Sequence, residues 1–224
     1  MEKRPVEEPL LRILEARHHD PFEVLGRHVK GERALIRAFL PKAEQACIVE
    51  PDLPMQRIPG TDFFEWSGAS DQVAQRYQIA WTDASGHSSS NYDPYCFPRE
   101  ISDFDMHLFG QGKHWHAHNV LGAHPYSVDG VEGVLFATWA PNADRVSVIG
   151  DFNGWDGRVH PMRNCGSSGV WELFLPGIVV GSLYRFEIRA HNGAILVKND
   201  PYARLFQMRP QNAGVVTARP DHTW

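Results

Sequence analysis

One series of short motifs occurs twice in this chain of 224 residues, with the two copies about 100 residues apart. The matched positions are Gly26 and Gly122, His28 and His124, Pro41 and Pro141, Tyr77 and Tyr184, and Asp93-Pro94-Tyr95 and Asp200-Pro201-Tyr202. The spacing between copies changes only in stretches that are compatible with surface loops, where insertions cost little. The repeat therefore predicts two homologous domains in tandem.

Short β-like runs bounded by turn residues fill both copies. In the second copy, apolar Tyr184, Phe186 and Ile188 alternate with charged residues, which predicts one strand face toward the core and one toward solvent. Several short strands at such spacing are typical of immunoglobulin-like β-sandwiches. A (β/α)₈ barrel needs about 250 residues and βα alternation, which this chain lacks. We therefore expect an all-β fold of two tandem immunoglobulin-like sandwiches and no catalytic barrel.

The two ends and the middle of the chain lie outside the repeated motifs. An apolar stripe of Leu10, Leu11, Ile13 and Leu14 before Pro21 predicts a short N-terminal helix. The expected organisation is this helix within 1–19, a first sandwich at 20–98, a linker at 99–118, a second sandwich at 119–215, and the start of another linker at 216–224.

The tight turn after the apolar run 145–149 carries a tryptophan that turn chemistry does not require. Gly150, Asn153 and Gly154 suit a turn because glycine and asparagine tolerate positive φ. Trp155 either folds back onto the core or is held out as a flat platform. The first copy lacks both the glycine turn and the tryptophan at the matching place, 50–55. The fold alone does not need Trp155, which favours a binding role and indicates that the first domain is structural.

The residues of this turn carry a family resemblance. APNA at 140–143 and VSVIGDFNGW at 146–155 resemble a family-48 carbohydrate-binding module. Most of the remaining chain is similar to the amino-terminal part of bacterial 1,4-α-glucan (glycogen) branching enzymes. The motifs are DPFEVLG at 20–26, LGAH at 121–124, WDGRVHPM at 155–162 and NDPY at 199–202.

The resemblance implies a non-catalytic region of a larger glycosyltransferase. The parent enzyme would cleave an α-1,4 bond of a glucan and attach the segment to a 6-hydroxyl, forming an α-1,6 branch in glycogen. This region would bind the glucan weakly and position it, with Trp155, Asn153 and Arg185 as the implied sugar-binding residues. Arg185 has a second interpretation, an ordinary solvated arginine. Regulatory relatives carry another tryptophan after the turn at Asn192-Gly193, and this chain does not.

Two other functions stay open at this point. One is a purely structural module that supports the barrel without sugar affinity, and the other is a free-standing glucan-binding regulatory subunit. The expected partners are α-1,4-glucan or glycogen and the catalytic barrel of the parent enzyme. A net charge of −5 argues against nucleic acid and anionic membranes. An odd number of cysteines without CxxC spacing and the absence of an apolar signal segment predict a cytoplasmic protein.

Other candidate residues have plain structural interpretations. Asp144, Asp151, Asp156 and Asp200 read as turn or cap residues, so we expect no catalytic pair of carboxylates. His114, His116 and His118 alternate, but no cysteine or carboxylate lies near them in sequence, so neither a metal nor a cofactor is predicted. Four tryptophans within β-like runs are expected in the core: Trp66, Trp81, Trp139 and Trp171. Trp115 and Trp224 fall outside the sandwiches, and Trp224 is expected to begin the contact with the barrel.

Overall fold

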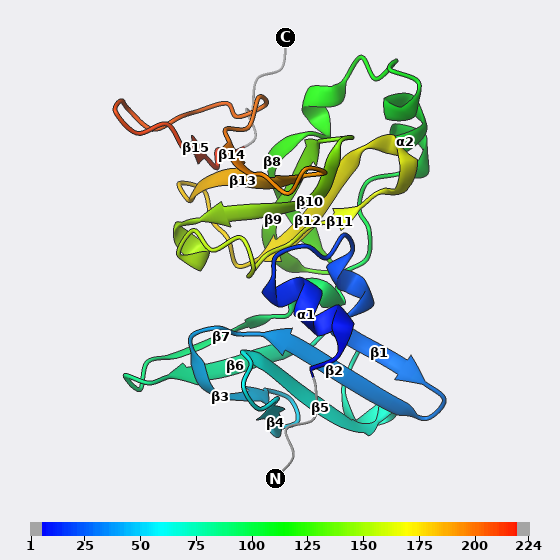
Figure 1. Cartoon of the computed structure of the whole chain (residues 1–224), viewed down its shortest axis with the longest axis vertical. Helices are drawn as coiled ribbons and strands as arrows, with labels where there is room; N and C mark the ends of the chain where they lie inside the picture. The colour runs from blue at the N-terminus through cyan, green and yellow to red at the C-terminus, as the bar shows by residue number, and fades with distance from the viewer. Residues whose placement is uncertain (1–5, 219–224) are drawn as a thin grey trace. The chain divides into compact units, whose positions relative to one another are not determined.

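The computed structural model describes residues 6–218 and divides the chain into two compact units. Within the described part, the first unit contains 6–10 and 22–98, and the second contains 11–21 and 99–218. The structure is mostly β-sheet, as predicted, with two α-helices, α1 (Glu8–Leu14) and α2 (Asp103–Gly110) (Figure 1). The expected N-terminal helix is therefore present, and the described residues contain no barrel.

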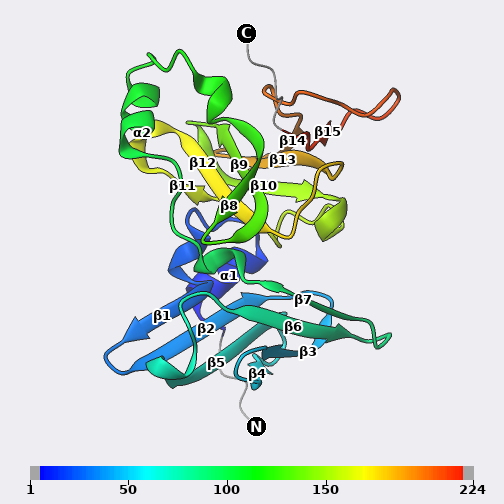
Figure 2. The same ribbon diagram turned by 180° about the vertical axis from the view of Figure 1, so that it is seen from behind.

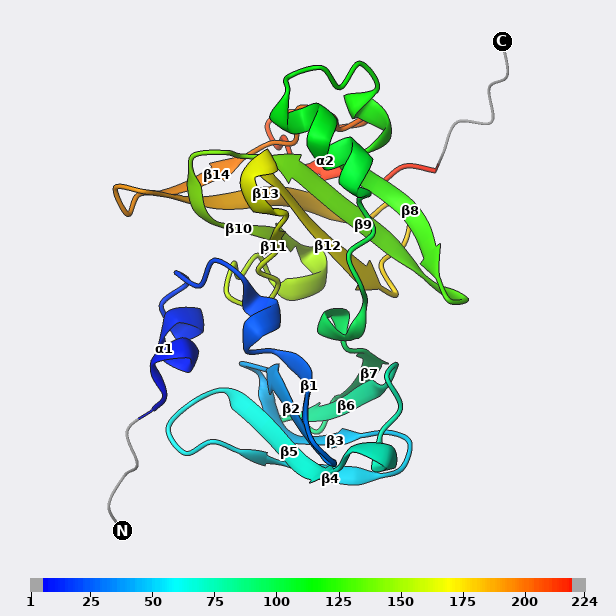
Figure 3. The same ribbon diagram turned by 90° about the vertical axis from the view of Figure 1, so that its right-hand side faces the viewer.

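The first unit contains seven antiparallel strands in the order β1-β2-β5-β4-β3-β6-β7. Their bounds are β1 (Gly26–Lys30), β2 (Arg33–Phe39), β3 (Ala43–Ile48), β4 (Leu53–Arg57), β5 (Phe63–Ala69), β6 (Gln78–Asp83) and β7 (Ser88–Tyr92). Strand β4 connects the strands β1, β2 and β5 to the strands β3, β6 and β7. Its residues 53–55 pair with β3, whereas Gln56 and Arg57 pair with β5. Figure 3 shows β1, β2 and β5 on one side of this unit and β3, β6 and β7 on the other.

The second unit is built from two four-stranded sheets, β10-β13-β14 with β15 beside β13, and β11-β12-β9-β8. The strands are β8 (Gly122–Val128), β9 (Val131–Trp139), β10 (Ala143–Gly150), β11 (Arg163–Asn164), β12 (Val170–Pro176), β13 (Leu183–Ala190), β14 (Ile195–Lys198) and β15 (Gly214–Val215). The sheets share an aromatic core, since the Phe136 ring of β9 lies 5.2 Å from the Tyr184 ring of β13. Figure 2 shows the same strands from behind.

The repeated motifs make the same contacts in both units. The Nε2 of His28 donates to the carbonyl of Leu25 at 3.1 Å, and that of His124 donates to Leu121 at 3.0 Å. The two matched histidines therefore make equivalent hydrogen bonds in the two units. Tyr77 likewise bonds to the buried Asp93, and the Tyr184 hydroxyl donates to Asp200 at 2.6 Å. Burial raises the pKa of Asp93 to about 6 and also raises that of Asp200.

The stretch at 99–118, expected to be a linker, contains α2 and is held to the second unit. Ser102 caps α2, because its hydroxyl accepts from the Asp105 amide at 3.1 Å. Met106 and Phe109 pack against a buried cluster that includes Ile101. The carboxylate of buried Glu172 accepts from the backbone amides of Glu100 at 3.0 Å and Ile101 at 2.9 Å. These contacts fix the start of the stretch on sheet β11-β12-β9-β8.

Candidate functional site

The turn that carries Trp155 begins where β10 ends. A Cβ on Gly150 would lie 2.2 Å from the Leu183 carbonyl, so only glycine fits at this close approach of β10 and β13. The 3₁₀ turn η5 (Asp151–Asn153) follows, and Gly154 and Trp155 then both take the left-handed conformation, with φ of 64° and 63°. The amide of Trp155 donates back to the Gly150 carbonyl at 2.9 Å. The indole is thereby turned outward, and 39 % of Trp155 is exposed.

Asn153 fixes this turn from inside. Its Oδ1 accepts from the Gly150 amide at 2.9 Å, and its Nδ2 donates to the Val148 carbonyl at 3.0 Å. The same Nδ2 lies 3.0 Å from Nδ1 of His160. Both ends of the side-chain amide are thus occupied by the protein, and Asn153 is buried. Its position indicates support of the turn that presents Trp155.

A buried arginine anchors the far side of the same loop. Arg145, only 1 % exposed, donates to the Gly157 carbonyl at 2.6 Å and also bonds to Ser147 and Glu187. A Cβ on Gly157 would lie 2.0 Å from the Glu187 carboxylate, so the loop backbone presses onto this ion pair. Desolvation lowers the pKa of the Arg145 guanidinium. The sequence repeat did not predict this network, because its members lie on β10, on β13 and in the loop that follows β10.

Arg185 lies beside the exposed indole. It projects from β13, and its guanidinium carbon is 5.8 Å from the centre of the Trp155 ring. Its Nη2 donates to the side chain of Asn212, a residue that sequence reasoning missed. No local pattern links Asn212 to Arg185, since they are separated by 27 residues. The structure therefore brings Trp155, Arg185 and Asn212 together, with Asn153 beneath them.

His160 makes the stability of the folded site depend on pH. Burial lowers the pKa of its imidazole to about 4, so the folded protein keeps the ring neutral and able to accept from Asn153. The unfolded chain binds a proton near the usual value of about 6.5, so protonation favours unfolding as the pH falls. This contribution to stability is complete above about pH 6.5 and is lost progressively toward pH 4.

We predict that His160 makes the free energy of unfolding of the second unit decrease as the pH falls from about 6.5 toward 4. Urea unfolding followed at pH values between about 7 and 5 measures it, with His160→Gln as the matched variant. The wild type should lose more stability than the variant on acidification. Equal losses in the two proteins would contradict the assignment.

The other tryptophans divide into buried and exposed ones. Trp66 and Trp171 are buried, as expected, and Trp81 is half-buried. The prediction for Trp139 is wrong, because 54 % of it is exposed at the end of β9, where its Nε1 donates to the Ser168 carbonyl at 3.1 Å. Trp115 is 90 % exposed, and Trp224 lies outside the described residues.

The acidic residues near the turn all have structural partners. Asp156 pairs with Arg158 at 2.7 Å, a contact that lowers the pKa of the Asp156 carboxyl. Asp151 accepts from the Leu183 amide at 3.3 Å, Asp144 contacts His191, and Asp200 accepts from Tyr184 and Tyr202. His114 turns toward Asp105 at 2.8 Å and stacks on Phe109. Among residues 6–218, no helix is both long and apolar enough to cross a membrane.

Comparison with known proteins assigns both units. Residues 7–95 match the alpha-1,4-glucan branching enzyme GlgB N-terminal domain, and residues 120–203 match Carbohydrate-binding module 48 (Isoamylase N-terminal domain). The chain belongs to the glycogen branching enzyme family, as its amino-terminal region. The second match covers β8 to β14 and so includes the Trp155 turn and Arg185. The resemblance found in the sequence motifs is therefore confirmed.

Two curated relatives agree with this assignment. The 1,4-alpha-glucan branching enzyme GlgB of Methylococcus capsulatus is 55 % identical over 95 % of this chain, and that of Cellvibrio japonicus is 50 % identical over the whole of it. The chain spans only 29 % and 32 % of these two proteins. Among solved structures, a type I pullulanase from Bacillus subtilis complexed with maltose matches 89 % of this chain and 27 % of its own, at 21 % identity and a TM-score of 0.38.

Proposed function

We propose that this chain binds an α-1,4-glucan segment of glycogen on the Trp155 surface, defined by Trp155, Arg185 and Asn212. The observation that carries the proposal is a partly exposed indole held on a left-handed turn by buried hydrogen bonds. A fixed indole offers a flat apolar face to a pyranose ring, and the two polar side chains can bond to its hydroxyls. Asn153 acts as a positioning residue, because its polar atoms are already used within the turn.

The expected affinity is low. Stacking one sugar ring on Trp155 buries about 100 Å² of apolar surface, worth about 2.5 kcal/mol. One or two hydrogen bonds add about 1 kcal/mol each. The contacts together give about 3.5–4.5 kcal/mol before association costs, so a single chain binds no more tightly than the millimolar range. A glycogen particle offers many chain ends, so later contacts become intramolecular and weak sites suffice.

The larger role follows from the relatives. Their name is 1,4-alpha-glucan branching enzyme, and the family resemblance implies a parent enzyme that forms α-1,6 branches by transferring an α-1,4-glucan segment. In such a protein this region would hold the glucan away from the active site, in the cytoplasm, and influence the length of the transferred segment. The catalytic barrel is the proposed protein partner. Exposed apolar residues support such a contact, and they are Ile195, Leu196 and Val197 on β14 together with Leu205 and Phe206.

A structural module without sugar affinity is the second candidate. The observation that favours it is the hairpin after Gly193, where apolar β14 stands in place of another aromatic platform. A free-standing regulatory subunit has less support, because residues 7–95 match a branching enzyme domain.

Native gel electrophoresis with and without glycogen in the gel tests the proposal. Glycogen should retard the wild-type chain, and Trp155→Ala should lose most of that retardation. Trp139→Ala is the matched control, since it removes another exposed indole of the same unit, and it should be retarded like the wild type. A folded wild type that migrates equally with and without glycogen would favour the structural module instead.

A further inference from the structure

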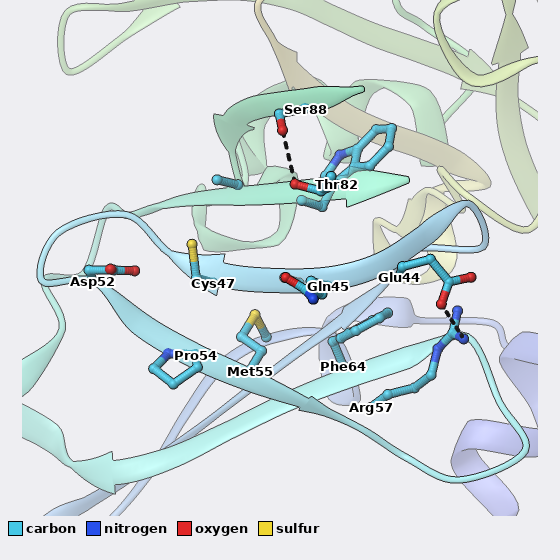
Figure 4. Close-up of a pocket in the computed structure, with 13 residues that line it drawn as sticks. Glu44, Gln45, Cys47, Asp52, Pro54, Met55, Arg57, Phe64, Thr82 and Ser88 are labelled. Atoms are coloured by element: carbon cyan, nitrogen blue, oxygen red, sulfur yellow. Dashed lines mark hydrogen bonds and ion pairs between the residues drawn. The ribbon is translucent and has the colours of Figure 1, made fainter. Parts of the chain in front are cut away.

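A hollow lies in the first unit where β4 leaves β3. The last pair between these strands is Ala46 with Met55, and from Gln56 onward β4 pairs with β5. The strands separate there and leave a cavity of about 440 Å³ (Figure 4). This volume lies within the range of about 300–1,000 Å³ that is usual for small-molecule sites. We call this cavity the β3–β4 hollow.

The charged side chains that line the hollow are the carboxylates of Glu44 and Asp52 and the guanidinium of Arg57, so negative charge predominates. The guanidinium of Arg57 lies 4.0 Å from Glu44 and 3.6 Å from Asp62, and it also donates to the Ala43 carbonyl at 2.6 Å. The arginine is therefore already neutralised and bonded, which disfavours an anionic ligand. The side-chain amide of the exposed Gln45 makes no hydrogen bond to any other residue within 6–218. Figure 4 shows Gln45 on β3 between Glu44 and Cys47. Its oxygen and nitrogen are available to a ligand that both donates and accepts.

Apolar side chains complete the lining. Met55 and Phe64 are buried beneath the hollow, and the half-buried Trp81 lines it from β6. Thr82 and Ser88 contribute hydroxyl groups that bond to each other at 2.9 Å. The lining combines aromatic and aliphatic surface with an uncharged amide, hydroxyl groups and charged carboxylates. Such a set suits a ligand with apolar faces and many hydroxyls, and it suits neither a phosphate nor a purely apolar molecule.

We propose that the β3–β4 hollow is a second glucan-binding site, in the unit that sequence analysis assigned a structural role only. Gln45 and the Glu44 and Asp52 carboxylates would bond to sugar hydroxyls, and Trp81 and Met55 would contact the ring faces. The choice of an α-1,4-linked glucan rests on the proposed function of the Trp155 surface. The hollow itself is defined independently, because its lining residues all lie between 44 and 88.

Cys47 supplies a reporter inside the hollow. It lines the cavity and is partly exposed, whereas Cys96 and Cys165 are buried. Burial and the neighbouring Asp52 carboxylate raise the pKa of Cys47. Burial raises the pKa of both Cys96 and Cys165 to about 12, which keeps these two thiols protonated. Only the thiolate reacts rapidly with alkylating reagents. Among the three cysteines, Cys47 should therefore be labelled first, and a ligand in the hollow should shield it.

The test measures the labelling rate of Cys47 in the full 224-residue chain by mass spectrometry, with maltoheptaose as the probe and cellohexaose as the control sugar. At maltoheptaose concentrations about ten times a millimolar dissociation constant, labelling should slow about tenfold. Cellohexaose should have little effect. A Cys47 rate unchanged by maltoheptaose, or slowed equally by both sugars, would overturn the proposal.

Two glutamine variants locate the effect. Gln45→Ala should weaken the protection of Cys47 about fivefold, the usual effect of one lost hydrogen bond. Gln56→Ala removes an exposed amide from β4 outside the hollow and should leave protection as in the wild type. Equal protection in both variants would contradict the placement of the ligand at Gln45.

A third variant separates this inference from the proposed function. Trp155→Ala should retain full maltoheptaose protection of Cys47 while it loses most of its retardation by glycogen. Loss of Cys47 protection in Trp155→Ala would overturn the independent second site. Retained retardation together with retained protection would refute the Trp155 surface and leave the hollow supported.

Discussion

Replacing Arg145 by alanine is expected to lower the free energy of unfolding of the second unit by about 3–5 kcal/mol, the usual cost of breaking a buried ion pair. The change leaves the Glu187 carboxylate without its partner and leaves the Gly157 carbonyl and the Ser147 hydroxyl without a donor. The loop that carries Trp155 loses its anchor at the same time. Urea unfolding followed by circular dichroism measures the stability, and native gels with glycogen measure the site.

Arg158→Ala is the matched control for this prediction. Arg158 lies in the same loop and pairs with Asp156, but its side chain is 41 % exposed. Exposed ion pairs contribute about 0–1 kcal/mol, so this variant should remain close to wild-type stability. If the two variants lost equal stability, Arg145 would not be the anchor that its contacts indicate.

Replacing Phe136 by alanine should cost a similar amount, about 3–5 kcal/mol, because the change opens a cavity in a closely packed core. Phe136 is fully buried, and its ring lies 5.2 Å from that of Tyr184 and 6.0 Å from that of Phe152. Phe152 belongs to η5, so the cavity would open directly beneath the turn of Trp155. Thermal or urea unfolding measures the loss.

The first unit offers a matched control for the Phe136 prediction. Phe63 is also fully buried, with its ring 5.1 Å from that of Phe39. Phe63→Ala should destabilise the first unit to a similar extent and leave glycogen retardation through Trp155 unchanged in folded protein. Retardation lost equally in both variants would show that the Trp155 surface does not depend specifically on the core beneath it.

Features with local or repeated patterns could be predicted from the sequence. The alternation at 184–188 correctly placed Tyr184 and Phe186 in the core. The matched positions His28 and His124 make equivalent hydrogen bonds in the two units. The glycine-rich turn and its outward tryptophan were also recognisable, because the turn requires glycine at 154 and the first unit has no equivalent of Trp155. These features depend on residues close together in the chain.

Features that depend on distant residues were missed. The Arg145 network and the contact between Arg185 and Asn212 join different elements, and no spacing rule identifies such pairs. Asparagine is favoured in turns whether its side-chain amide faces the core or the solvent. The sequence therefore did not predict that Asn153 is buried. Helix α2 had a local signal, Ser102 three residues before Asp105, but only its packing on the second unit shows that the stretch is not a simple linker.

Glucan binding on the Trp155 surface is tested by titrating the chain with maltoheptaose and recording nitrogen–proton NMR spectra of its seven tryptophan indoles. The Trp155→Phe variant assigns the Trp155 signal by its disappearance. We expect this signal to shift progressively and to saturate in the millimolar range, while the signal of buried Trp171 stays unchanged. A Trp155 signal that does not move at saturating sugar would contradict glucan binding on the Trp155 surface.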